Sequence, residues 1–300
     1  AALVERHRRA CVAAVLAVLT GLSYAELAAR YPRCAGAALY VQEGLRRQWL
    51  AVLVGFLIIL TGVVSAATLA NGFAGYLRVF ADVPDWVAMG GLILALGLLA
   101  ALGIAESIVA AAIVTILEIG GLIYMIAVTG DSLADLPARL PELTPPLEAA
   151  VWQGILLGAF LAFYAFIGFE DMVNVAEEVK EPQRNLPRAI LLSLATVTLL
   201  YMLVAVIAVL ALPLADLTAT TAPFALLYTR ATGEPATFIS LVSLVDVTNG
   251  ALIQIIMASR VLYGMGHEGW IPKAFCHVHA RTRTPLLATA LVTTIVAVLA

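Results

Sequence analysis

Residues 165–190 read AFIGFEDMVNVAEEVKEPQRNLPRAI and pass from apolar sequence into a run of charges. Glu170 and Asp171 stand next to each other while the surrounding sequence is still apolar. An ionisable side chain at the centre of a membrane helix costs about 2.5–3.5 kcal/mol on insertion scales. That cost falls if the helix opens at Gly168, because freed carbonyls then bind a cation and a carboxylate meets water or a partner. Discontinuous helices of this kind mark the substrate sites of transporters, so the stretch predicts a broken membrane helix. The alternative is that both carboxylates lie at the membrane surface and simply meet water.

The composition places the whole chain in a membrane. Of its 300 residues, 62% are hydrophobic and 12% are charged, and the charged fraction is about half that of a soluble domain. The net charge of −3 gives no basic surface for nucleic acid, so we expect no nucleic-acid partner. The three cysteines show neither a disulfide framework nor a metal-binding spacing.

Seven apolar runs have the roughly 20 residues that a membrane span needs. They cover residues 10–29, 49–77, 86–105, 107–129, 151–176, 189–212 and 236–259, and an eighth, shorter run covers 286–300. Backbone groups in lipid must bond within their own segment, and these runs are too long for barrel strands. The sequence therefore predicts an all-α multi-pass membrane protein, with residues 1–300 as a single transporter domain. The chain starts with Ala and stops in apolar sequence, so we expect a fragment truncated at both ends.

Basic residues predict the orientation, because cytoplasmic loops are rich in Lys and Arg. Eleven of the 17 basic residues follow the first, fifth and seventh predicted spans: Arg30, Arg33, Arg46, Arg47, Lys180, Arg184, Arg188, Arg260, Lys273, Arg281 and Arg283. We expect these loops to be cytoplasmic and the segment 176–190 to be a charged cytoplasmic linker. Arg6, Arg8 and Arg9 would fall on the opposite side, which truncation or a disturbed N-terminus explains; the alternative is a real exception in the topology. On that side, 213–235 contains PFALLY, which is either a short helix over the outer mouth or a plain connecting loop.

Three stretches carry a family resemblance. FYAFIGFEDMVNVAEEVKEPQRNLPRAI (163–190) resembles the sixth-helix signature of the amino acid–polyamine–organocation (APC) permeases. GLSYAELAARYPRCAGAALYV (21–41) resembles the end of their second helix, and ASRVLYGMGHEGWIPKAFCHVHARTRTP (258–285) the end of their eighth. The order and spacing match, and the chain is most similar to bacterial permeases that are related to cationic amino acid transporters.

The resemblance implies the leucine-transporter-type fold of two inverted repeats, of which this chain covers about helices 2 to 9, with the break at Gly168. It also implies secondary active amino acid transport by alternating access, as a symport with protons rather than sodium, in the plasma membrane or the bacterial inner membrane. No enzymatic activity and no cofactor are implied. The particular amino acid and the oligomeric state stay open.

Residue by residue, the family's substrate-facing break falls on Tyr164, Ala165, Phe166, Ile167 and Gly168. In the family, carbonyls at this break accept hydrogen bonds from the substrate ammonium group, and the aromatic residue matched by Tyr164 closes over the substrate. A ring adds cation–π attraction to such a site. The alternative for Tyr164 and Phe166 is ordinary helix packing.

Three carboxyls are candidates for proton coupling. Glu170 matches a commonly acidic family position, and Asp171 faces the cytoplasmic vestibule or bonds Asn174. Glu118 lies deep in the predicted span 107–129, at a position where proton-coupled relatives often have a lysine. Alternatives for Glu118 are a bound cation, or a neutral acid that is hydrogen-bonded within the helix bundle.

Two further pairs complete the predicted sites. Asp246 and Asn249 share a helix face in the span that matches the pocket-lining eighth helix, where an aspartate favours cationic substrates; plain interhelical hydrogen bonding is the alternative. Glu26 and Arg30 form an i,i+4 pair, to which we assign a structural role at the cytoplasmic gate.

Other functions fit less well. Cys276, His277, His279 and His267 are the only grouping that suggests a metal, and we expect none there. An intramembrane enzyme is disfavoured because the sequence offers no nucleophile–base arrangement. The alternatives within the family are an amino acid/amine exchanger and a non-transporting sensor or defective remnant.

Overall fold

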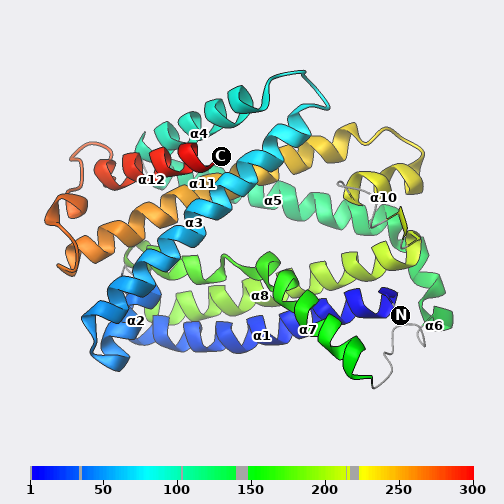
Figure 1. The fold of residues 1–300 in the computed structure, drawn as a ribbon, viewed down its shortest axis with the longest axis horizontal. Coiled ribbons are helices and arrows are strands. Elements are labelled where there is room, and N and C mark those ends of the chain that lie inside the picture. Colours follow the sequence, from blue (N-terminus) through cyan, green and yellow to red (C-terminus); the bar gives the residue numbers. More distant parts are fainter. Residues whose placement is uncertain (1, 34–35, 103, 140–147, 214, 217–222) are drawn as a thin grey trace. The chain divides into compact units, whose positions relative to one another are not determined.

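The computed structural model describes residues 2–33, 36–102, 104–139, 148–213, 215–216 and 223–300 (Figure 1). Within these ranges the regular structure is entirely helical, and seven helices are long and apolar enough to cross a membrane. The prediction of an all-α multi-pass membrane protein is confirmed. The spans run through α1 (Ala2–Arg30), α3 (Gln48–Leu77), α4 (Asp85–Leu102), α5 (Ile104–Thr129), α7 (Ala149–Phe163), α8 (Pro182–Ala211) and α11 (Thr237–His267), and α12 (Leu286–Leu299) is a shorter apolar helix. The short ones are α2 (Gly36–Leu45), η1 (Gly130–Asp135), α6 (Leu136–Arg139), η3 (Tyr164–Phe166), η4 (Phe169–Glu178), α10 (Pro223–Thr232) and η5 (Lys273–Cys276).

The chain divides into two compact units, each built from three separate segments. Unit 1 contains Ala1–Glu26, Ile119–Phe169 and Pro187–Ile239. Unit 2 contains Leu27–Glu118, Glu170–Leu186 and Ser240–Ala300. Several long helices therefore begin in one unit and end in the other.

Unit 2 has a core made by α3, α4, α11 and α12 (Figure 1). Many of its buried residues are small, including the fully buried Ala66, Ala70 and Ala288. Lipid tails are as apolar as these side chains, so membrane helices associate through close packing, which small residues permit. At Gly97 of α4, an added Cβ would lie 2.7 Å from Thr293 Oγ1 of α12. The backbones of these two helices therefore approach closely at this glycine.

Unit 1 is held together by aromatic contacts and close helix packing. Tyr124 of α5 meets Phe238 edge-on, with ring centroids 5.6 Å apart, and meets Tyr228 of α10 at 6.4 Å. A Cβ added at Gly21 of α1 would collide with Leu194 of α8. The absence of a side chain at Gly21 of α1 therefore lets the apolar side chain of Leu194 in α8 pack closely against it.

Helix α8 corrects the prediction of a charged linker over 176–190. The helix begins at Pro182, where the missing N–H does no harm in the first turn, and the amides of Arg184 and Asn185 both bond Glu181 O at 3.0 Å. Arg188 is exposed whereas Leu186 is buried, so the charged residues occupy the open face of the first turns. Only residues 179–181 separate η4 from α8.

Helix α11 also extends beyond its predicted end at residue 259, to His267. Arg260, which the sequence placed in a basic loop, is instead buried within this helix, and its Nε donates to Asn174 O at 2.8 Å. Val261 and Met265 continue the core face of the helix and are fully buried. The apolar face of α11 therefore continues beyond Arg260, because the buried charge of Arg260 is hydrogen-bonded to the Asn174 carbonyl.

Two short helices also bear on the sequence analysis. The PFALLY stretch lies in α10, which resolves the choice between helix and loop in favour of a helix. Helix α2 was not predicted, although Ala38 and Leu39 within it are fully buried. Arg6, Arg8 and Arg9 lie within α1, which begins at Ala2.

Candidate functional site

The helix that carries the opening stretch is broken where the sequence predicts it. Helix α7 ends at Phe163, η3 covers Tyr164–Phe166, and Ile167 has an extended backbone with ψ 135°. Gly168 has φ +126°, a region that side-chain-bearing residues rarely occupy. The last carbonyls of an opened helix end lack the N–H that a continuing helix would supply; here the Tyr164 carbonyl accepts the Ile167 amide at 3.2 Å. The break is thus a place where a membrane helix can offer backbone acceptors to a ligand.

Aromatic side chains hold the break from both sides within unit 1. Phe166 is 5% exposed and meets Tyr201 of α8 edge-on at 5.7 Å. Phe169 meets Tyr24 of α1 edge-on at 5.8 Å. The Phe166 side chain is therefore engaged in packing, whereas Tyr164 is 50% exposed. Of the two rings considered for a substrate, only Tyr164 is accessible.

A carboxyl–carboxamide cluster joins α5 and α11 within unit 2. Asn249 Nδ2 donates to Glu118 Oε1 at 3.0 Å and makes a longer contact of 3.5 Å with Thr115 Oγ1. Asn249 is 6% exposed, and Glu118 is half-buried. Asp246, one turn before Asn249, lies close enough for a Coulomb interaction with Glu118. Residues that the sequence assigned separately to coupling and to substrate binding thus form one cluster.

A second carboxyl is held by the same helix. Gln254 Nε2 of α11 donates to Asp171 Oδ2 of η4 at 3.0 Å, and Asp171 is 8% exposed. The two predicted settings for Asp171 were the vestibule and a bond to Asn174, whereas its hydrogen-bond donor in the structure is Gln254. Burial explains the difference, because a carboxyl that leaves water needs a donor in the protein.

Asn174 adds a further link between η4 and α11. Its carbonyl accepts the bond from buried Arg260 described above, and its side chain lies against Gly36, where an added Cβ would be 2.7 Å from Asn174 Oδ1. With the Gln254–Asp171 bond, this gives η4 two polar attachments to α11. The half-helix after the break is therefore anchored within unit 2.

The remaining predicted residues are placed as follows. Tyr164 to Gly168 belong to unit 1, whereas Glu118, Glu170, Asp171, Asp246 and Asn249 belong to unit 2. Glu170 is half-buried next to Asp171, with which it interacts electrostatically. Glu26 and Arg30 are exposed side chains near the end of α1. In the part of the chain that the structure describes, no three His, Cys, Asp or Glu side chains are placed to hold a metal ion.

A family model described as "Amino acid permease" matches residues 10–300. The chain belongs to the amino acid permease family. This permease is 29% identical to human cationic amino acid transporter 4 over 93% of its own length and 46% of the relative's. It is 27% identical to the branched-chain amino acid permease BcaP of Bacillus subtilis (strain 168), covering 93% of the chain and 63% of the relative. It is 28% identical to the vacuolar cationic amino acid transporter 4 of Arabidopsis thaliana, over 96% of the chain and 51% of the relative.

The permease chain thus spans about half to two thirds of the length of these relatives. Their names are those of transporters and permeases rather than enzymes, as the sequence led us to expect. The relatives are named for more than one substrate class, and the Arabidopsis thaliana protein is also named for the vacuole.

Sequence reasoning missed three of the polar partners in this permease: Thr115, Gln254 and Arg260. Gln254 and Arg260 share a signal that was present in the sequence, because both lie among apolar residues that continue a membrane span. Polar side chains at such depth must find partners within the protein. What the sequence does not provide is which partner each one finds.

Proposed function

We propose that the full protein is a secondary active amino acid transporter that is driven by protons and works by alternating access. The observation that carries the proposal is the Glu118–Asn249–Asp246 cluster, which places a protonatable carboxyl among apolar membrane helices of an amino acid permease. A carboxyl at such a position can take up a proton on one side of the membrane and release it on the other. Symport is therefore the reading that the cluster supports best.

The broken helix supplies the second half of the proposal. The α-ammonium group of an amino acid needs acceptors, and the backbone from Tyr164 to Gly168 offers them without a full counter-charge. The exposed ring of Tyr164 is suited to cover the ammonium group by cation–π attraction. Glu170 and Asp171 follow directly on the chain, so proton binding there would act on the half-helix next to the break.

Transport by the full-length protein in liposomes tests the proposal. Uptake of a labelled amino acid should rise when the lumen is made alkaline. Glu118→Gln should remove most of that stimulation, because glutamine keeps an acceptor for Asn249 but cannot titrate. Glu170→Gln and Asp171→Asn test the other two carboxyls in the same way. Asp82→Asn is the matched control, since Asp82 is exposed in the connection between α3 and α4.

The outcomes separate three mechanisms. Stimulation that survives in all three neutral variants would leave transport standing but remove these carboxyls from the coupling. Uptake that ignores the gradient in the wild type would leave facilitated transport or exchange, and acceleration by unlabelled substrate in the lumen would identify an amino acid/amine exchanger. Stimulation of uptake by a sodium gradient instead of a proton gradient would identify sodium as the coupling ion.

Substrate class is part of the proposal. Asp246 is an exposed carboxylate close to Glu118, and a fixed negative charge favours a basic side chain. We therefore expect arginine or lysine to be transported in preference to leucine. Asp246→Asn should reduce that preference more than it reduces leucine uptake; an unchanged preference would remove Asp246 from substrate selection.

The orientation is proposed from the basic residues. Because Arg260 lies within α11, the basic residues that indicate the cytoplasmic side are those in the first turns of α8 and those of the connections: Arg33, Arg46, Arg47, Lys180, Lys273, Arg281 and Arg283. We propose that these face the cytoplasm of a plasma membrane or bacterial inner membrane. Single cysteines at Lys180 and Asp82 in a cysteine-free protein should label from opposite sides of intact cells.

A further inference from the structure

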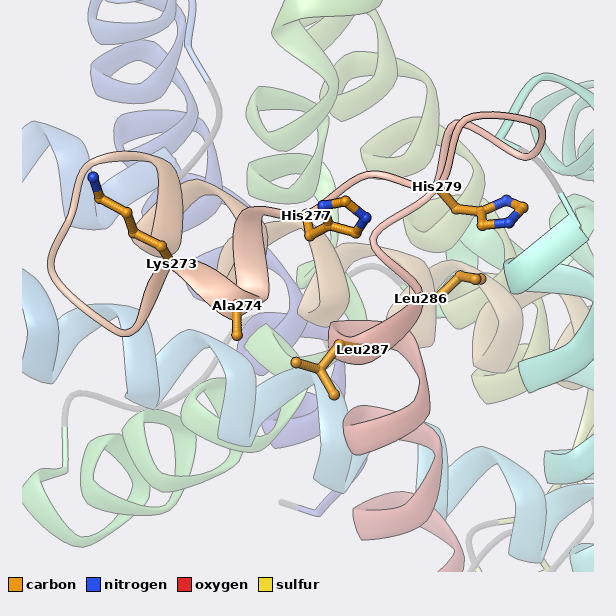
Figure 2. A pocket seen from close by; sticks show the side chains of 6 residues that line it. All are labelled: Lys273, Ala274, His277, His279, Leu286 and Leu287. Atoms are coloured by element: carbon orange, nitrogen blue, oxygen red, sulfur yellow. The ribbon is translucent and has the colours of Figure 1, made fainter.

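A pocket in unit 2 is lined by none of the candidate-site residues. It has a volume of about 640 Å³ and is lined by Lys273, Ala274, His277, His279, Leu286 and Leu287 (Figure 2). Lys273 and Ala274 come from η5, the two histidines from the following loop, and the two leucines from the start of α12. The pocket thus lies where an apolar helix meets a polar connection.

The lining has a polar side and an apolar side. In Figure 2 the rings of His277 and His279 lie above the side chains of Ala274 and Leu287, and the Lys273 side chain extends away from them. Leu286 is 36% exposed and Leu287 is 50% exposed. A lysine with a long apolar stem and a charged end suits a boundary between lipid and water.

The loop that forms the pocket is fixed by its own hydrogen bonds. The amide of His279 bonds Thr284 O at 3.0 Å, and the amide of Arg283 bonds His279 O at 2.9 Å. Thr284 Oγ1 in turn donates to Ala101 O of α4 at 3.0 Å. The Thr282 amide and hydroxyl lie 3.5 Å and 3.3 Å from His279 Nδ1. The polar side of the pocket is therefore carried by a braced loop.

The charge around the pocket is positive. Lys273, Arg281 and Arg283 are exposed in this connection. The acidic residue that begins it, Glu268, is already ion-paired with Arg33 at 3.2 Å. An anion is consequently the ligand that the polar side selects.

The apolar side continues away from the pocket along α12. Leu287, Leu291, Ile295 and Val298 are all exposed, by 50%, 38%, 37% and 80%, and their spacing of three to four residues places them on one face of the helix. This stripe starts at the pocket and is long enough to accompany an acyl chain. A soluble anion would make no favourable contact with this apolar stripe.

We propose that the pocket binds the phosphate of an anionic phospholipid, with the acyl chains of the lipid lying along the exposed stripe of α12. Lys273, His277 and His279 supply the polar contacts to the headgroup. The inference is independent of amino acid transport and of the coupling ion.

Native mass spectrometry of the full-length protein in detergent, with titrated phosphatidylglycerol or phosphatidylcholine, tests the proposal. Phosphatidylglycerol should bind more tightly, and Lys273→Ala/His277→Ala should weaken it by about fivefold or more, since each basic residue near a lipid surface contributes on the order of a fivefold change in binding. Lys180→Ala is the matched control, an exposed lysine in the connection between η4 and α8, and should bind phosphatidylglycerol like the wild type.

Three results would overturn the proposal. Equal binding of the two lipids would show that charge does not select the occupant. Equal loss in Lys180→Ala would show a non-specific effect of net charge. Full competition by millimolar inorganic phosphate would assign the pocket to a soluble anion. A melting curve of each variant without lipid distinguishes lost binding from a misfolded protein.

Discussion

The Asn249 side chain donates its amide hydrogen to the carboxyl of Glu118 at 3.0 Å, and thereby joins α11 to α5 inside unit 2. The two residues are 131 positions apart in the chain. Hydrogen bonds between membrane helices contribute about 0.6 kcal/mol on average and at most about 1.7 kcal/mol. The bond is therefore a modest contribution to stability, but it fixes which oxygen of Glu118 is already engaged.

Replacing Asn249 with aspartate should affect function more than stability. The Asn249→Asp variant loses the donor and places a second carboxyl against Glu118, with Asp246 already nearby. We expect gradient-driven uptake in liposomes to fall at least tenfold. Thr248→Val is the control, because the Thr248 hydroxyl donates to the Leu244 carbonyl of its own helix. Equal loss of uptake in both variants would point to damage to α11 in general.

Removing Gln254 should loosen η4. The Gln254→Leu variant removes the side-chain amide that donates to the buried carboxyl of Asp171, which costs about 1–3 kcal/mol. We expect a lower melting temperature and faster hydrogen exchange across η4. The double variant Gln254→Leu/Asp171→Leu should lose less than the sum of the two single changes, because it leaves no unpaired carboxyl. Additive losses would argue against the pair, and Ser259→Ala, whose hydroxyl bonds its own helix, should change little.

Gly168→Ala tests the break itself. The φ of +126° at this position lies outside the regions open to L-residues, so a side chain there costs on the order of 1–3 kcal/mol. The variant should either straighten the helix or shift the backbone from Tyr164 to Gly168, and substrate affinity should fall with it. Gly120→Ala is the control, since an added Cβ there meets nothing within 4 Å. Wild-type affinity in Gly168→Ala would remove the break from substrate binding.

Two glycines of α4 offer a matched pair for the core of unit 2. A Cβ at Gly97 would press on Thr293 of α12, whereas a Cβ at Gly91 meets nothing within 4 Å. Overpacking costs about 1–3 kcal/mol, while Gly to Ala at an open helix position gains about 0.5–1 kcal/mol. Gly97→Ala should therefore lower the melting temperature and Gly91→Ala should raise it slightly. A fall of similar size in both would contradict the close approach of α4 and α12.

Sequence reasoning reached the fold because membrane spans are long and apolar, and because a carboxylate pair next to a glycine is costly in an unbroken helix. It therefore located the spans and the break at Gly168. The sequence prediction is wrong at Arg184 and Arg260, where a charged residue was interpreted as part of a loop. Both residues continue a helix, the first because its charge stays on the exposed face and the second because it has a buried partner.

The candidate site was only partly within reach of the sequence. Glu118, Asp171 and Asn249 were all identified as polar residues that need a reason to be in a membrane. Their partners could not be assigned, because the pairs Glu118–Asn249 and Asp171–Gln254 depend on the register between helices that are far apart in the chain. Whether Tyr164 to Gly168 hold a substrate, and whether the carboxyls titrate, stays a prediction.

The division of the chain into interleaved segments has a consequence for biosynthesis. Helices α3 and α4 are translated early, yet the residues that complete their core come from α11 and α12, after position 240. The small-residue faces of α3 and α4 are therefore exposed to lipid, or covered by another protein, while some 140 intervening residues are made. A ribosome stalled before α11 would hold a nascent chain whose helices are inserted but whose second unit cannot yet assemble, and which quality-control proteases would meet in that state.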